Sequence, residues 1–213
     1  MTRHSVIPTA TLEFWFEFGS NYSYLAVMRI DAVAREFGVT LVWRPFLLGP
    51  IFKSLGWDNS PFVLQKAKGA YVWHDMVRQS EKYALPWTHP TQFPRRAILP
   101  TRVALLGAAE PWINDFCKEV MMVNFVKDRD IDTPEVVGNV LDALGLPSSD
   151  LIDRAQTDDN KRRLREQTEE ARQRGIFGAP TFLVGSEMFW GNDRLMDALS
   201  FAAGHGAGPP TAS

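Results

Sequence analysis

Two hydroxyl side chains, Ser20 and Ser23, stand where an apolar run gives way to a helical pattern. The run Phe14-Trp-Phe-Glu-Phe18 has the composition of a buried strand, and Gly19 breaks it. A hydroxyl at a helix start can donate a hydrogen bond to an anion, and the helix N-terminus adds partial positive charge. The chemistry we expect at Ser20 is therefore stabilisation of an anionic group. The alternative is a purely structural helix cap, which is our interpretation of Ser23.

The elements that position these serines form a strand–helix–strand unit. Residues 11–18 favour a strand, residues 22–37 a helix that Gly38 ends, and residues 39–44 a second strand. Connections this short predict two parallel strands with a right-handed crossover.

The C-terminal part of the chain predicts two more strands and a closing helix. Residues 181–184 and 188–190 are short apolar runs joined by Gly185-Ser-Glu187, a hairpin pattern. Residues 194–203 then favour a helix. Together with the N-terminal unit, these strands predict a four-stranded sheet with helices on both faces.

The middle of the chain is expected to be helical. Residues 46–62 contain Gly49, Pro50, Gly56 and Pro61, and we interpret them as irregular. Helical spacing then covers residues 62–83, 96–109, 112–127, 133–145 and 158–174. Pro100 predicts that the second of these helices is kinked or starts later.

The predicted architecture is therefore α/β, with a large all-helical insertion between a βαβ half and a ββα half. We assign residues 11–46 and 158–203 to the sheet domain and residues 47–157 to the insertion domain. Residues 1–10 and 204–213 are expected to be flexible termini, because they contain few large apolar residues.

Composition excludes several classes of protein. The chain has 213 residues, 45% of them hydrophobic, and a formal net charge of -2, which does not favour a nucleic-acid partner. No apolar run is long enough for a membrane span, so we expect a cytoplasmic protein with no membrane partner. The single cysteine, Cys117, allows no internal disulfide and is interpreted as a buried small hydrophobe. The four histidines show no metal-ligand spacing, so no metal is expected.

Several separate motifs resemble those of a known family. Ser20-Asn-Tyr-Ser-Tyr-Leu-Ala26, Gly175-Ile-Phe-Gly-Ala-Pro-Thr181 and Phe189-Trp-Gly-Asn-Asp-Arg-Leu195 carry most of the likeness. They resemble the thioredoxin superfamily with a helical insertion, as in the bacterial disulfide-oxidase family. More narrowly, they are similar to kappa-class glutathione transferases and 2-hydroxychromene-2-carboxylate isomerase. The likeness spans roughly residues 11–203. It departs at Asn21, where the family commonly has Pro, and in two extra residues near Trp57-Asp58.

The resemblance implies a thioredoxin-like fold and glutathione as the source of the thiol. Ser20 and Ser23 occupy the positions of the Cys-x-x-Cys pair, so Ser20 would donate to the glutathione thiolate and lower the pKa of that thiol. The carried-over glutathione contacts are Asn59 and Lys68 at the glycyl end, Ala179 and a cis Pro180 along the cysteinyl backbone, and Asn192 and Asp193 at the γ-glutamyl end. Lys53 would contact the substrate. For each of these residues the alternative is a structural or solvated role.

The resemblance favours a glutathione-dependent isomerase acting on 2-hydroxychromene-2-carboxylate or a similar aromatic conjugated keto acid. A kappa-like transferase or peroxidase needs the same glutathione site with a more open second pocket. A non-catalytic thioredoxin-fold binding protein is a third hypothesis. The missing cysteine pair argues against a disulfide oxidoreductase. A homodimer is implied by the resemblance alone.

Overall fold

The computed structural model describes residues 10–204, so most of both predicted flexible termini lies outside the described residues. Four strands form one sheet in the order β2-β1-β3-β4. β1 (Thr11–Phe16) pairs in parallel with β2 (Thr40–Pro45) and antiparallel with β3 (Thr181–Val184), which pairs with β4 (Glu187–Trp190). The predicted four-stranded thioredoxin-like sheet and its parallel βαβ unit are confirmed.

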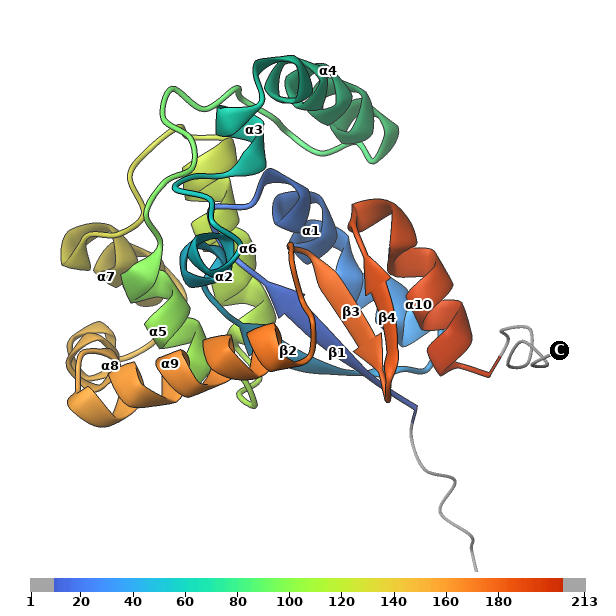
Figure 1. The fold of residues 1–213 in the computed structure, drawn as a ribbon. Coiled ribbons are helices and arrows are strands. Elements are labelled where there is room, and N and C mark those ends of the chain that lie inside the picture. The colour runs from blue at the N-terminus through green and yellow to red at the C-terminus, as the bar shows by residue number, and fades with distance from the viewer. Residues whose placement is uncertain (1–9, 205–213) are drawn as a thin grey trace, which may run out of the picture.

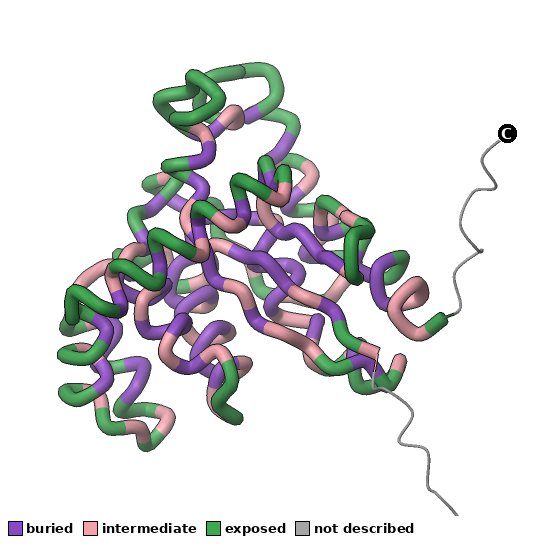
Figure 2. The backbone as a smooth tube through the Cα atoms, turned by 60° about the horizontal axis from the view of Figure 1, so that its bottom comes forward, coloured by how far each residue is buried: buried purple, intermediate pink, exposed green. Residues whose placement is uncertain are grey.

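The central strand β1 separates two apolar cores because its side chains alternate between the faces of the sheet. Leu12, Phe14 and Phe16 pack into the larger core, beneath α1 (Asn21–Glu36) and α10 (Leu195–Ala202). Trp15 points the other way. It packs in a second core with residues of α2 (Leu48–Ser54) and α9 (Asp158–Gln173). Figure 1 shows these helices on opposite faces of the sheet, and Figure 2 shows that buried residues are concentrated along the strands.

Between β2 and β3 the chain is helical, as predicted. This insertion contains α3 (Pro61–Leu64), α4 (Lys66–Lys82), α5 (Ile98–Leu106), α6 (Ile113–Phe125), α7 (Pro134–Ala143) and α8 (Ser148–Ala155). The helix α5 starts at Ile98, which places Pro100 in its first turn, where a missing N–H costs no helical hydrogen bond. Sequence analysis left two alternatives for the effect of Pro100, a kink or a later start of the helix. The structure supports the later start.

Two predictions about the insertion were wrong. Residues 46–62 are not wholly irregular, since α2 occupies Leu48–Ser54. Gly49 and Pro50 lie in its first turn, where a proline is tolerated, and so they do not break it. The helix expected over residues 62–83 is interrupted at Gln65, whose extended backbone (φ -107°, ψ 92°) separates α3 from α4.

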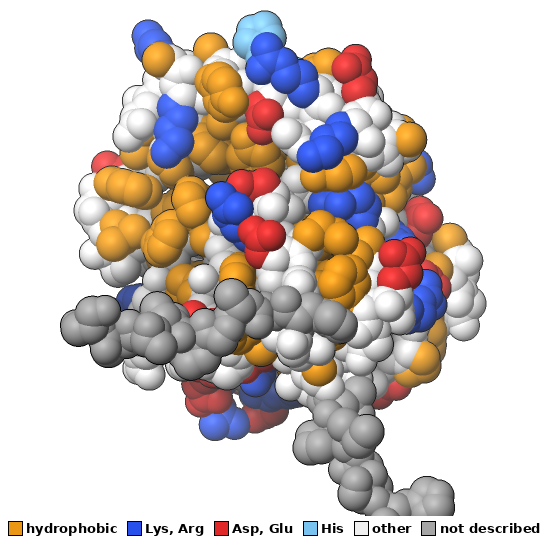
Figure 3. Space-filling view, turned by 90° about the vertical axis from the view of Figure 1, so that its right-hand side faces the viewer, with side chains coloured by type: hydrophobic (Ala, Val, Ile, Leu, Met, Phe, Trp, Pro, Cys, Tyr) orange, Lys and Arg blue, Asp and Glu red, His pale blue; other side chains and the backbone are white. Residues whose placement is uncertain are grey.

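The chain ends with a short 3-10 turn, η1 (Asn192–Arg194), that leads into α10. Gly191 precedes this turn with φ 109°, a conformation that favours glycine. None of the helices formed by residues 10–204 is both long enough and apolar enough to cross a membrane. The face shown in Figure 3 mixes Lys and Arg with Asp, Glu and hydrophobic side chains rather than presenting one sign of charge.

Candidate functional site

Ser20 caps α1 and also forms a hydrogen bond to the loop that precedes β3. Its backbone is extended (φ -84°, ψ 118°), and its Oγ accepts a hydrogen bond from Ser23 N at 3.2 Å. The same hydroxyl donates to the carbonyl oxygen of Ala179 at 2.9 Å, across 159 positions of sequence. The structural capping role is therefore present. The proposed anion-binding role would use the same hydroxyl and the same helix start.

The peptide bond between Ala179 and Pro180 is cis, as the resemblance implied. The Pro180 carbonyl accepts from Gly191 N at 2.9 Å, which fixes this loop against the start of η1. Ala179 borders the cavity described below, whereas Pro180 is buried and does not line it. A second cis bond, between Phe93 and Pro94, lies on the opposite wall of that cavity.

Arg29 of α1 determines how Asn192 presents its amide. Arg29 Nη2 donates to Asn192 Oδ1 at 2.6 Å, and Arg29 Nε donates to Leu25 O at 3.0 Å. The guanidinium also lies 3.5 Å from the centre of the Tyr83 ring. Because a guanidinium only donates, Asn192 must turn its oxygen toward Arg29, which leaves the Nδ2 group for an acceptor. Asn192 is buried and lines the cavity, so this end of the site favours an anionic or carbonyl oxygen.

Asp193 and the residues of the insertion have more exposed positions. The Asp193 carboxylate lies 3.8 Å from Arg194 Nε and is largely exposed. Asn59 Oδ1 accepts from Ser60 N at 2.7 Å, in the turn that leads to α3. Lys68 is exposed on α4, with Nζ 5.7 Å from the Phe62 ring.

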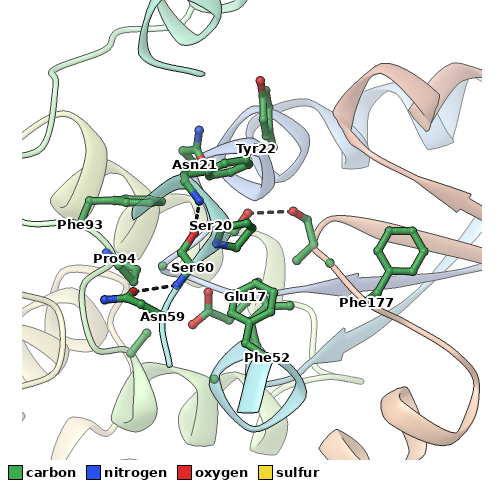
Figure 4. A pocket seen from close by; sticks show the side chains of 18 of the residues that line it. Glu17, Ser20, Asn21, Tyr22, Phe52, Asn59, Ser60, Phe93, Pro94 and Phe177 are labelled. Carbon is green, nitrogen blue, oxygen red and sulfur yellow. Dashed lines mark hydrogen bonds between the residues drawn. The ribbon is translucent and has the colours of Figure 1, made fainter. Parts of the chain in front are cut away.

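A single cavity of about 970 Å³ brings most of the predicted site together. It is bordered by the Ser20 turn, the insertion and the C-terminal loop, and Figure 4 shows Ser20 near its centre. Of the predicted site residues, those lining it are Ser20, Asn59, Lys68, Ala179, Asn192 and Asp193. Lys53 is exposed on α2 and does not line it. Trp57 and Asp58, near which the two extra residues fall, do line it.

Aromatic side chains make up much of the cavity wall. Phe52 and Trp57 lie together on one side, with ring centres 5.8 Å apart. Phe177 and Trp190 lie on another side with ring centres 4.8 Å apart, and both are substantially exposed. A flat, ring-bearing ligand would find apolar surface here.

The sequence matches the family described as DSBA-like thioredoxin domain over residues 11–201. The chain belongs to this DSBA-like thioredoxin family. It is 31% identical over 195 residues to 2-hydroxychromene-2-carboxylate isomerase of Sphingobium xenophagum, and the match covers 88% of this chain and 95% of that one. It is 25% identical to glutathione S-transferase kappa 1 of Rattus norvegicus, with 94% and 95% covered.

A solved structure agrees with the sequence relatives. A structure of 2-hydroxychromene-2-carboxylate isomerase superposes with a TM-score of 0.81 at 27% identity, covering 92% of this chain and 95% of that one. The predicted resemblance is confirmed.

This DSBA-like chain has no cysteine at its helix start. Cys117 is fully buried in α6, where burial raises the pKa of its thiol, so the interpretation as a buried small hydrophobe is confirmed. Within residues 10–204 no group of three or more His, Cys, Asp or Glu side chains could hold a metal ion. Sulfur chemistry at this site would need a thiol from another molecule.

Sequence analysis assigned no role to three residues that line the cavity: Tyr22, Asp75 and Glu17. Tyr22 donates to Asp75 Oδ2 at 2.7 Å, and burial together with this carboxylate raises the pKa of Tyr22. Glu17 borders the cavity, and burial raises the pKa of Glu17 to about 8, although the Gly19 N–H opposes the rise. An acidic residue inside the aromatic run Phe14–Phe18 was the signal that could have identified Glu17.

Proposed function

We propose that this protein is a glutathione-dependent isomerase acting on 2-hydroxychromene-2-carboxylate or a similar aromatic conjugated keto acid. The observation that carries the proposal is the placement of Ser20. Its hydroxyl lies at the start of the 16-residue helix α1 and borders an aromatic-walled cavity. The likeness to an isomerase over nearly the whole chain supports the same activity.

The residues at the cavity fit glutathione by their chemistry. Its thiolate would meet the Ser20 hydroxyl and the N-terminus of α1, both of which favour negative charge. The γ-glutamyl carboxylate would accept from Asn192 Nδ2, and the exposed Asp193 carboxylate would pair with the α-ammonium group. Lys68 would meet the glycyl carboxylate as a point charge, and Asn59, which also lines the cavity, would contact the same end of the ligand.

When bound, glutathione supplies the thiolate that adds reversibly to a conjugated double bond and makes it rotatable. The protein's own residues would stabilise the thiolate and orient the substrate. Ser20 would turn its hydroxyl from Ala179 O toward the anion while keeping its cap on Ser23 N. The aromatic walls would exclude water and hold the flat substrate. Of the two lysines considered for carboxylates, Lys68 borders the cavity and Lys53 does not, so Lys53 would reach substrate only at the rim.

A kappa-like transferase is the second candidate function. The volume of the cavity, about 970 Å³, and the exposed Phe177–Trp190 pair favour it, because a transferase must admit and release a larger conjugate. The likeness to the rat kappa enzyme supports it more weakly than the likeness to the isomerase supports the first function.

The deciding experiment follows the absorbance of 2-hydroxychromene-2-carboxylate with and without glutathione. We expect conversion that requires glutathione but does not consume it, and that falls about 100-fold or more in Ser20→Ala. Ser186→Ala, in the exposed β3–β4 turn, is the matched control and should convert normally. Thiol consumption with an activated aryl halide and no isomerisation would favour the transferase. Binding of glutathione with neither reaction would favour a non-catalytic protein.

A further inference from the structure

Glu17 is a carboxylic acid at the site to which the proposed function assigns no role. It directly follows β1, and its backbone carbonyl accepts from Ser20 N at 3.1 Å, so the two residues close one turn. The Glu17 side chain is half-buried and lines the same cavity as Ser20. A Cβ added at Gly19 would lie only 3.1 and 3.3 Å from its carboxyl oxygens, so the carboxyl group folds over a residue with no side chain.

The carboxyl of Glu17 lies away from Ala179, the contact proposed for the cysteinyl backbone of glutathione, and nearer to Asn59 and Phe52. In Figure 4 it lies below Ser20, between Phe52 and the Asn59–Pro94 side, while the hydrogen bond of Ser20 to Ala179 runs the other way. The nearby wall contains Phe52 and Trp57, which we assigned to the aromatic substrate. Glu17 therefore lies beside the aromatic wall that we assigned to the substrate.

The cationic side chains of the cavity do not pair with Glu17. They are Lys68, Arg95, Arg96 and Arg194. Among the described residues, the three arginines form ion pairs with other carboxylates: Arg95 with Asp128, Arg96 with Asp132, and Arg194 with Asp197. Lys68 is exposed on α4. No ion pair of residues 10–204 includes Glu17, so burial dominates its titration and raises the pKa of Glu17 to about 8.

The acidic and phenolic groups of the cavity also do not contribute to the pKa of Glu17. Asp75 accepts from Tyr22, and Asp193 lies beside Arg194. Asp58 and Tyr71 are exposed. The rise in the pKa of Glu17 comes from its burial, and none of these charges is among its causes. Glu17 is consequently mostly protonated at neutral pH, and can donate a hydrogen bond there.

We propose that Glu17 is a catalytic acid of the isomerisation, donating first a hydrogen bond and then its proton to the keto oxygen of the conjugated substrate. This inference rests on the proposed function. 2-Hydroxychromene-2-carboxylate is a cyclic hemiketal, so its C2–O ring bond first breaks, the C=O forms, and the proton of the 2-hydroxyl passes to the phenolic oxygen. As the electron pair of the nucleophile then enters the conjugated system of this open form, a π pair moves to the keto oxygen. The Oε–H bond of Glu17 breaks, and an O–H bond forms on that oxygen.

The return step restores every group. After rotation about the former double bond, the Glu17 carboxylate takes the same proton back, the C=O and C=C bonds re-form, and the nucleophile leaves with its electron pair. No group is oxidised or reduced, and no proton is consumed. A carboxyl group that is kept neutral at neutral pH is an effective donor to an oxygen that gains negative charge.

The test combines a titration with kinetics in Glu17→Gln, an isosteric variant that keeps the volume of the side chain. Protein labelled with carbon-13 at the glutamate carboxyl is titrated by NMR, and the resonance missing in Glu17→Gln is assigned to Glu17. We expect it to titrate near pH 8, and to titrate higher when 2-hydroxychromene-2-carboxylate is added with a non-thiol glutathione analogue. Glu187→Gln, at the exposed start of β4, is the control.

The kinetic arm measures isomerisation and thiolate absorbance separately. We expect Glu17→Gln to lower kcat about 100-fold or more while the bound thiol ionises as in the wild type. Wild-type kcat/KM should fall above about pH 8, and kcat should fall only at a higher pH, because bound substrate raises the pKa of Glu17. A wild-type rate in Glu17→Gln, with glutathione-dependent isomerisation intact, would overturn the role of Glu17 alone. If the wild-type protein isomerises nothing, the titration still decides. A pKa of Glu17 near 4.5 that does not change when the keto acid is added would overturn the inference. A pKa near 8 that the keto acid raises would uphold the contact between Glu17 and the substrate.

Discussion

At the residue scale, the Ser20 hydroxyl already makes two hydrogen bonds in the structure, one as acceptor and one as donor. An incoming anion competes only for the donated proton, because the cap on Ser23 N uses the oxygen lone pair. The exchange would replace a neutral acceptor, Ala179 O, by a charged one, which forms the stronger hydrogen bond. Capping and anion binding are thus compatible in one side chain.

Asn192 offers an isosteric test of the γ-glutamyl contact. Asn192→Asp keeps the oxygen that accepts from Arg29, but replaces the donating Nδ2 by a second acceptor. We expect unchanged or greater thermal stability and about tenfold weaker or worse glutathione binding, because the new carboxylate repels that of the ligand. Calorimetric titration measures the binding. Unchanged affinity would show that Asn192 Nδ2 does not meet the carboxylate.

Glu17 predicts how stability depends on pH. Its pKa in the folded protein, about 8, lies above the ordinary value of 4.5, so the folded state holds the proton more tightly than the unfolded state. This contribution is fully present below about pH 4.5 and is lost as pH rises toward 8. Relative to Glu17→Gln, the wild type should therefore lose free energy of unfolding over this range, by at most about 5 kcal/mol. Urea unfolding at pH 5 and pH 8.5 measures the difference, and parallel losses in the two proteins would contradict the prediction.

At the element scale, the start of α1 is joined to the insertion by the hydrogen bond from Tyr22 to Asp75 of α4. Asp75 also accepts from Gln79 Nε2 at 3.3 Å, one turn later on the same helix. The residues of α4 include Lys68, so this contact helps to set the distance between the two walls of the cavity.

Removal of that hydrogen bond should loosen α4 selectively. In Tyr22→Phe we expect a loss of about 1 kcal/mol of stability and faster amide hydrogen exchange in α4, with little change in the central strands. Exchange measured by mass spectrometry on peptides from residues 66–82 and 11–16 gives the comparison. Equal acceleration in both segments would indicate a global effect instead.

The secondary structure that sequence reasoning recovered depends on local periodicity. The aromatic alternation of β1 and the Gly38 stop after α1 are local features, and both predicted the βαβ unit. The helix α2 was missed because Gly49 and Pro50 usually end helices, whereas here they lie in a first turn. Position within a helix, rather than residue type alone, decides what a proline does.

At the scale of the whole molecule, the site depends on contacts that no local pattern contains. Ser20 meets Ala179, and Arg29 meets Asn192 across 163 positions, only because the sheet brings β1 beside β3. The rise in the pKa of Glu17 likewise comes from its burial in the folded chain. The resemblance suggested six residues that line the cavity, but it gave no indication of these pairings or of which lysine borders the cavity.

The central claim is that the Ser20 turn holds a glutathione thiolate, and the ultraviolet absorbance of that thiolate tests it directly. Protein and glutathione are titrated together from pH 5 to pH 10, for the wild type, Ser20→Ala and the control Ser186→Ala. The account predicts that the wild type and the control lower the pKa of the bound thiol by one unit or more, and that Ser20→Ala raises it back toward that of free glutathione. Superimposable curves for the wild type and Ser20→Ala, with glutathione bound to both, would contradict the account.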